Sequence, residues 1–265
     1  MMRGLLVAAV PDITDTLEIT TKIGCPVNCL KYCPQDVLVK RYKGERELTL
    51  ENFKLLLKTV PKTVDVRFSG FCEPFANRHA IDMMEYAYRQ GYLITVFTTL
   101  YQATEDDVAR LSKLKFGIFR LHFPDGVAMK IPITEAYMRN VFAVIQNVKN
   151  VSFMTMNDEF KTVGREDFVR GKISRTRPVR FCPQLYYPDF VLLPNGDLQL
   201  CCQDFGLWHT VGNLFKEDYP TIRARFLAHK RDYALCSCCP QNLSRTKAAL
   251  KYGKVAVERK LKLKE

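Results

Sequence analysis

Apolar and polar positions alternate with two different periods between residue 17 and about residue 157. Strict alternation is typical of half-buried strands, whereas apolar residues three or four positions apart are typical of helices. Pro61 and Gly91 follow two of the helical stretches, and a Thr-x-x-Asp box at Thr104 opens another. The pattern predicts strands at residues 17–23, 64–70, 93–99, 116–123 and 151–156, and helices at residues 48–60, 80–90, 104–114 and 133–147.

This alternation of strands and helices predicts an α/β fold with a parallel sheet and right-handed crossovers. Such a sheet closes into a TIM-like barrel or remains a partial barrel, with its functional site at the carboxyl ends of the strands. The pattern fails from residue 158 to residue 180, where the chain is polar and basic. That segment is a linker or an irregular sixth unit, and we assign no sixth strand to it.

Within the fourth strand, Arg120 and His122 share one face, while Phe119, Leu121 and Phe123 share the other. We expect the apolar face to meet the helices and the polar face to point into the barrel. Charges there must be paired or must contact a ligand. We assign Arg120 and His122 to the catalytic site, with His122 as a substrate contact or proton acceptor. Alternation places six more polar side chains inside: Glu18, Thr20, Lys22, Asp65, Arg67 and Ser69.

Composition is that of an ordinary globular protein, with 265 residues of which 47% are hydrophobic. This length suits one large domain, alone or with a small second one. No apolar run approaches the roughly 20 residues that span a bilayer. The apolar stretch at residues 5–10 is shorter than the core of a signal peptide. We therefore expect a cytoplasmic protein.

The net charge is +12, and the tail at residues 244–265 contributes eight Lys or Arg against two Glu. A basic surface can attract nucleic acid or anionic membranes, but a solvated helical tail has the same composition. No RNA-recognition signature accompanies the charge. Nucleic acid is thus a partner that the sequence allows but does not favour.

Three evenly spaced cysteines, Cys25, Cys29 and Cys33, lie in the run GCPVNCLKYCP. Their spacing would align them on a helix, but Pro26 and Pro34 disfavour one. A loop around a [4Fe–4S] cluster fits better, and three thiolates would leave one iron open. The alternatives are a structural zinc site, which requires four ligands, and inert buried thiols.

A second group of cysteines lies in the last third of the chain. The Asn195-Gly196 pair predicts a hairpin between residues 190–193 and 197–200. The hairpin would bring the following cysteine near the segment that precedes it, and four thiolates could then hold an auxiliary iron–sulfur cluster or a zinc ion. Two other cysteines, 202 and 238, are spare, although the latter could replace a neighbour. The predicted ligands are Cys182, Cys201, Cys236 and Cys239.

The first cysteine loop resembles that of the radical S-adenosylmethionine (SAM) enzymes, whose usual motif is Cys-x3-Cys-x2-Cys with an aromatic residue before the third cysteine. Tyr32 occupies the aromatic place, and one extra residue separates Cys29 from Cys33. The resemblance implies a partial TIM-like barrel. It also implies an open iron that chelates SAM, whose reductive cleavage gives a 5'-deoxyadenosyl radical that abstracts a hydrogen atom from the substrate.

The segment SGFCEP after the second strand resembles the family's Gly-Gly-Glu-Pro motif, which binds the SAM amino group. Its members here would be Gly70, Cys72, Glu73 and Pro74, with a cysteine where glycine is usual. The resemblance also places the ribose and carboxylate of SAM near Thr98 and Thr99. The alternatives are that Glu73 only begins a helix and that the threonines only favour a strand.

The second cysteine group resembles the SPASM or twitch extension of this family, in which Cys-x(9–15)-Gly-x4-Cys opens the domain. Cys182, Gly196 and Cys201 fit that spacing. The implied division is a barrel at 1–176, an auxiliary cluster domain at 177–243 and the basic tail at 244–265.

These resemblances imply a radical SAM oxidoreductase in which an auxiliary cluster accepts an electron. Only 24 residues precede Cys25, which favours a small substrate such as a sugar, a cyclitol or a nucleotide-linked sugar alcohol. Flavodoxin or ferredoxin would supply electrons. Peptide maturation or epimerisation is the alternative, and a metal-stabilised RNA-binding protein is the alternative of another class.

Overall fold

The computed structural model describes residues 14–27, 29, 33–124, 126, 129, 131–155, 182, 184, 187–228, 234–239 and 246. Their core is one sheet whose strand order is β5-β4-β3-β2-β1-β6-β7-β8. Strands β5 to β6 in this order run parallel to one another, whereas β7 runs antiparallel to both β6 and β8. The strands are β1 (Thr16–Ile19), β2 (Asp65–Phe68), β3 (Ile94–Thr98), β4 (Ile118–Phe123), β5 (Val151–Thr155), β6 (Asp189–Leu192), β7 (Asp197–Gln199) and β8 (Thr210–Asn213).

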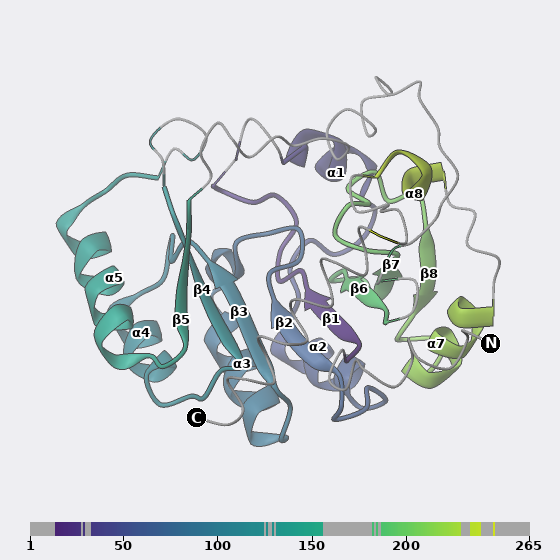
Figure 1. Ribbon diagram of the computed structural model, residues 1–265, viewed down its shortest axis with the longest axis horizontal. Helices are drawn as coiled ribbons and strands as arrows, with labels where there is room; N and C mark the ends of the chain where they lie inside the picture. The colour runs from purple at the N-terminus through teal and green to yellow at the C-terminus, as the bar shows by residue number, and fades with distance from the viewer. Residues whose placement is uncertain are drawn as a thin grey trace.

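Helices follow the parallel strands, as the alternation predicts, and Figure 1 shows α2 to α5 succeeding one another along the sheet. The C-terminal elements β6 to β8, α7 and α8 lie together at the other end of the molecule (Figure 1). The predicted α/β class is therefore confirmed. The helices are α1 (Gln35–Arg41), α2 (Leu50–Leu57), α3 (Ala80–Arg89), α4 (Glu105–Leu111), α5 (Glu135–Asn147), α7 (Tyr219–Ala228) and α8 (Ala234–Cys238), with a 3-10 turn η1 at Pro74–Ala76.

The two faces of the parallel strands have different chemistry. Leu17, Val66, Val96 and Phe119 lie on one face, are fully buried and belong to the same core as the apolar sides of the helices. Burying each such side chain stabilises the fold by about 1.5–3 kcal/mol. The opposite face, here called the inner face, bears polar side chains: Glu18, Arg67, Thr95, Arg120, His122 and Ser152, together with Phe97.

The first strand is shorter than the pattern predicts, because it ends at Ile19. Lys22 makes an isolated bridge to Glu47 instead, and its ammonium lies 3.4 Å from the Glu47 carboxylate. The prediction that Lys22 points into the barrel was therefore wrong. The alternation continues by chance beyond the point at which the chain leaves the sheet.

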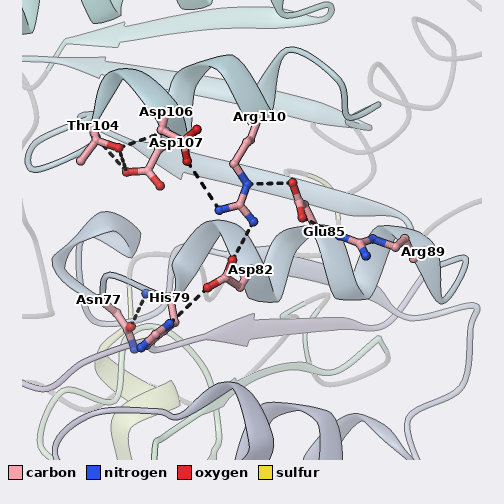
Figure 2. A network of polar contacts seen from close by, with 9 residues as sticks. All are labelled: Asn77, His79, Asp82, Glu85, Arg89, Thr104, Asp106, Asp107 and Arg110. Carbon is pink, nitrogen blue, oxygen red and sulfur yellow. Dashed lines mark hydrogen bonds and ion pairs between the residues drawn. The ribbon is translucent and has the colours of Figure 1, made fainter.

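Helices α3 and α4 are joined by a charged network on the surface of the molecule (Figure 2). Arg110 of α4 donates to Asp82 at 2.6 Å and to Glu85 at 2.9 Å, both on α3. The predicted Thr104 box is present and caps α4 through Asp107. No helix within the described ranges is long and apolar enough to cross a membrane.

Candidate functional site

The first cysteine loop begins just beyond β1, at the carboxyl end of the sheet. Cys29 is buried, and Cys25 and Cys33 are half-buried. The loop closes on itself where the Cys33 amide donates to the Cys29 carbonyl at 3.1 Å. Tyr32, the predicted aromatic member, lies outside the described residues.

Gln35, which the sequence analysis does not single out, ties this loop together from the first turn of α1. Its Nε2 donates to the Phe71 carbonyl at 2.6 Å and to the Cys33 sulfur at 3.3 Å. Its Oε1 accepts from the Cys25 amide at 3.3 Å. One buried amide thus contacts both ends of the loop and the turn that follows β2.

That turn depends on glycine at its first position. Gly70 has φ +48°, and a Cβ there would lie 2.5 Å from the Thr20 hydroxyl and 2.7 Å from the Ile19 carbonyl. The Thr20 hydroxyl accepts from the Phe71 amide at 3.1 Å. Glycine therefore lets the turn pack directly against the end of β1, which is where the cysteine loop begins.

The turn brings two further groups to the first cysteine. The Glu73 amide donates to the Cys25 sulfur at 3.3 Å. The thiol of Cys72 hydrogen-bonds to Cys25, and this bond and burial raise the pKa of Cys72 well above its usual value. The same bond lowers the pKa of Cys25 despite its burial. Donors aimed at Cys25 suit a thiolate, which is the form that binds iron.

Glu73, Thr98 and Thr99, which the resemblance assigns to SAM binding, lie in contact with one another. The Glu73 carboxylate accepts from the Thr98 hydroxyl at 2.5 Å, and from the Thr99 amide at 2.8 Å and hydroxyl at 2.7 Å. It also caps η1, because it accepts from the Phe75 amide at 3.4 Å. Burial raises the pKa of Glu73, and the threonine bonds oppose that rise.

These four donors fill the acceptor positions of the carboxylate. An ammonium group could therefore reach Glu73 only by displacing one of them. The next residue of the motif, Pro74, opens η1, and its carbonyl accepts from the Thr21 hydroxyl at 3.0 Å. The whole motif is thus anchored to the first strand and to the end of β3.

On the inner face, Arg67 lies within an internal ion-pair cluster. Its guanidinium lies 3.5 Å from Glu18, 3.3 Å from Asp65 and 3.7 Å from Asp189. These side chains come from β1, β2 and β6, so the cluster joins the barrel strands to the hairpin strands. Glu18 and Asp65, which the alternation places inside the barrel, thus pair with Arg67 there.

Arg120 and His122 lie further along the inner face, on β4. Arg120 Nε donates to the Ser152 hydroxyl at 3.3 Å, and its guanidinium lies 4.9 Å from the centre of the Phe97 ring. Burial, and then the charge of Arg120, lower the pKa of His122 to about 4. The imidazole is therefore neutral at pH 7, and its buried Nε2 has no hydrogen-bond partner in the described part of the chain.

The second cysteine group gathers around the predicted hairpin, which is present as β6 and β7. Cys201 follows β7, and Cys236 lies in α8. Burial raises the pKa of Cys201, and the nearby Cys202, Cys239 and Cys236 thiols add to the rise. Cys182 is buried in the same core. Among the described residues, no three histidine, cysteine or acidic side chains already stand as a complete metal site.

No family model matches this chain, and neither does any curated protein. Among solved structures, BtrN in complex with AdoMet and 2-DOIA has a TM-score of 0.64 at 16% identity, covering 87% of this chain and 94% of BtrN. The structure of anSMEcpe with bound AdoMet and Kp18Cys peptide has a TM-score of 0.52 at 12% identity, covering 94% and 98%. This chain therefore shares its fold with BtrN and anSMEcpe, which agrees with the partial TIM-like barrel that the sequence led us to expect.

Proposed function

We propose that this chain is a radical SAM enzyme, with a [4Fe–4S] cluster on Cys25, Cys29 and Cys33. The contact between the Glu73 amide and the Cys25 sulfur is the observation on which the proposal rests most. It joins the cysteine loop to the turn that resembles the family's SAM-binding motif. Both similar structures contain bound AdoMet, which is the same compound as SAM, and this supports the assignment.

When bound, the cluster would supply the electron that cleaves SAM. The chain's own groups would orient it: amide donors from Glu73 and Gln35 point at two of the three ligand sulfurs. Glu73 would hold Thr98 and Thr99 in place beside the cluster. We therefore assign SAM contacts to the backbone of the turn and to the threonines, with Glu73 as their support.

We propose a small molecule as the substrate, contacted by Arg120 and His122 on the inner face. The similar fold of BtrN, whose structure is a complex with 2-DOIA, supports this choice, because BtrN has the higher of the two TM-scores. A peptide is the second candidate, because the structure of anSMEcpe contains a bound peptide. Electrons would come from a flavodoxin or ferredoxin.

We assign the auxiliary cluster to Cys182, Cys201, Cys236 and Cys239, as an electron acceptor for the oxidised substrate. Replacing Cys201 and Cys239 together should spare SAM cleavage and stop product formation. Circular dichroism must accompany this test, because metal binding can contribute to folding. A folded double variant that lacks the second metal and still turns over normally would make the site a structural one, for which zinc fits equally well.

The test of the main proposal is anaerobic reconstitution, with iron counting and a SAM-cleavage assay. Two [4Fe–4S] clusters would give about eight iron per chain. Replacing Cys25, Cys29 and Cys33 by Ala should remove about half of the iron and all cleavage. Full iron loading in this triple variant would overturn the assignment.

Cys72 provides the matched control. Its thiol contacts Cys25, so a fourth thiolate could close the cluster and leave no open iron. In the proposed site Cys72 is a neighbour and not a ligand. Cys72→Ala should therefore keep the iron and the cleavage of SAM, whereas loss of half of the iron would identify Cys72 as a ligand.

A further inference from the structure

Two arginines on the inner face approach the same aromatic ring, but only one of them has acidic partners in the described part of the chain. The Arg67 guanidinium lies 5.3 Å from the centre of the Phe97 ring and is paired with three carboxylates. Arg120 lies 4.9 Å from the same ring, and its one polar partner within the described ranges is the hydroxyl of Ser152. The hydroxyl and the ring replace only part of the hydration that this half-buried cation has lost, and no described carboxylate balances its charge.

The surroundings of Arg120 leave its donors available. A guanidinium that packs against an aromatic ring keeps N–H groups that can bind a planar or tetrahedral oxyanion in a fork. His122 lies two residues further along β4, close enough for the charge of Arg120 to lower its pKa. Its neutral imidazole, with an unpartnered buried Nε2, adds a hydrogen-bonding group without repelling an anion.

We propose that Arg120 binds an oxyanion group of the substrate, a phosphate or a carboxylate, with His122 as a neutral hydrogen-bonding partner. The inference rests on the proposed substrate site and narrows the class of substrate that would bind there. The required oxyanion is present in a sugar phosphate, in a nucleotide-linked sugar and in an acidic peptide group. An uncharged sugar or cyclitol lacks it.

The test titrates the reconstituted protein with inorganic phosphate, with acetate and with glucose, and follows the histidine side chains by NMR. His122→Gln assigns the signal. Phosphate or acetate should shift the His122 signal in a saturable manner and raise its pKa, because the bound anion offsets the charge of Arg120. Comparing the phosphate titration with the acetate titration identifies the preferred oxyanion. Glucose, which carries no charge, should have no effect.

Arg120→Met should abolish this response, and Arg120→Lys, which keeps the charge but loses the fork, should weaken it. Arg139→Met, on the exposed side of α5, should respond like the wild type. An unchanged His122 signal with both anions, or the same response without Arg120, would overturn the inference. SAM cleavage, measured on the same preparation, separately tests the proposed function.

An independent observation concerns Gln35, whose amide orientation is fixed by its neighbours. The Phe71 carbonyl can only accept, and the Cys25 amide can only donate, so the nitrogen of the Gln35 side chain must face Phe71. That nitrogen also faces the sulfur of Cys33 at 3.3 Å. A flipped amide would place an oxygen against both acceptors.

The geometry points to Gln35 as a positioning residue that tunes the cluster through its N–H···S bond to Cys33. Hydrogen bonds to the ligand sulfurs are among the factors that set the potential of an iron–sulfur cluster, because they stabilise its more negative, reduced form. Gln35 would therefore make the cluster easier to reduce. This inference also rests on the proposed cluster.

The test compares the midpoint potential of the reconstituted cluster in the wild type, in Gln35→Leu and in the surface control Gln90→Leu. The first variant should keep its iron and be about tenfold harder to reduce, which corresponds to about 59 mV for one electron. The control should match the wild type. Gln35→Glu, which keeps an acceptor for the Cys25 amide but loses the donor, should shift the potential in the same direction.

Equal potentials in the wild type and in both Gln35 variants would overturn this role. A merely structural Gln35 would change the unfolding midpoint and leave the potential unchanged. Absence of iron from the cysteine loop of the wild-type protein would overturn the proposed function as well, so the two failures are distinguishable.

Discussion

The surface joining α3 to α4 and the inner face of the sheet both contain arginines, but the polar groups around them are satisfied to different degrees. On the surface, Arg110 contacts Asp82, Glu85 and Asp106, and Figure 2 shows its donors directed at these carboxylates. On the inner face, Arg120 has a hydroxyl as its polar partner, and His122 keeps a buried nitrogen unpartnered in the described part of the chain. The surface network is complete without a ligand, and the inner face is not.

The inner face is itself divided in the same way. Towards β1 and β6, Arg67 holds the carboxylates of Glu18, Asp65 and Asp189. Towards β4, no such cluster surrounds Arg120 among the residues that the structure describes. The two ends differ in charge pairing and not in hydrogen bonding, because Arg67 Nε and Asp189 Oδ1 are also buried without a hydrogen-bond partner in the described part of the chain. We therefore expect the Arg67 end to contribute mainly to stability and the Arg120 end to bind a ligand.

The largest expected effect is a contrast between Arg67→Met and Arg120→Met. Removing Arg67 leaves partly or fully buried carboxylates without their cation, which should cost about 3–5 kcal/mol of unfolding free energy. Removing Arg120 leaves no unpaired acid and should cost less than about 1 kcal/mol. Urea denaturation measures both. Equal costs would show that the two arginines do not divide the inner face into structural and binding parts.

A smaller effect is expected at Glu73, which lies between the structural and binding regions. Glu73→Ala leaves the hydroxyls of Thr98 and Thr99 without their acceptor and should cost about 1–3 kcal/mol. Because the threonines would lose their support, SAM should also bind more weakly, by roughly 10- to 150-fold if 1.5–3 kcal/mol is lost. Iron counting should show no loss.

Equilibrium binding of SAM and urea denaturation separate these two consequences. Glu47→Ala is the matched control, since its carboxylate pairs with Lys22 at the surface. If the Glu73→Ala variant is destabilised but binds SAM with unchanged affinity, Glu73 has no part in SAM binding and serves only to cap η1.

Local pattern was enough to predict the strand faces, which follow from the period of two residues. The choice of Glu73, Thr98 and Thr99 came from the resemblance to the family's motifs, and their contacts with one another were not predicted. The contact of Cys72 with Cys25 could not be predicted, because 47 positions separate them and only the Gly70 turn brings them together. The bonds of Gln35 and the pairing of β6 with β1 are likewise set by packing between distant segments.

Some predictions were limited because the two-residue alternation of a strand does not show where the strand ends. Alternation continues through Lys22 although β1 ends at Ile19, because a period of two cannot show where the chain leaves the sheet. Helix α1 was not predicted, because it begins directly after the cysteine loop, where Pro34 precedes its first turn. The division into barrel, cluster domain and tail stays a prediction.

The smallest expected effect concerns the surface of α3 and α4, where the charged side chains are paired with one another. Arg110→Met should cost about 1 kcal/mol, because three partly exposed ion pairs are lost together. Arg89→Met should cost less than about 0.5 kcal/mol, since the Arg89 side chain is 71% exposed. The hydrogen bond from Arg110 lowers the pKa of Glu85 below its usual value.

A carboxylate whose pKa is lower in the folded protein stabilises the fold above its unfolded pKa, which is about 4.3 for Glu. That contribution is lost as the pH falls through the lower, folded pKa. The difference in unfolding free energy between wild type and Arg110→Met should thus be largest near pH 7 and shrink below about pH 4. Urea denaturation across this range measures it. A difference that stays constant with pH would mean that Arg110 stabilises the helix pair by packing its aliphatic stem and not by its charge, and the surface would then no longer serve as the electrostatically complete counterpart of the inner face.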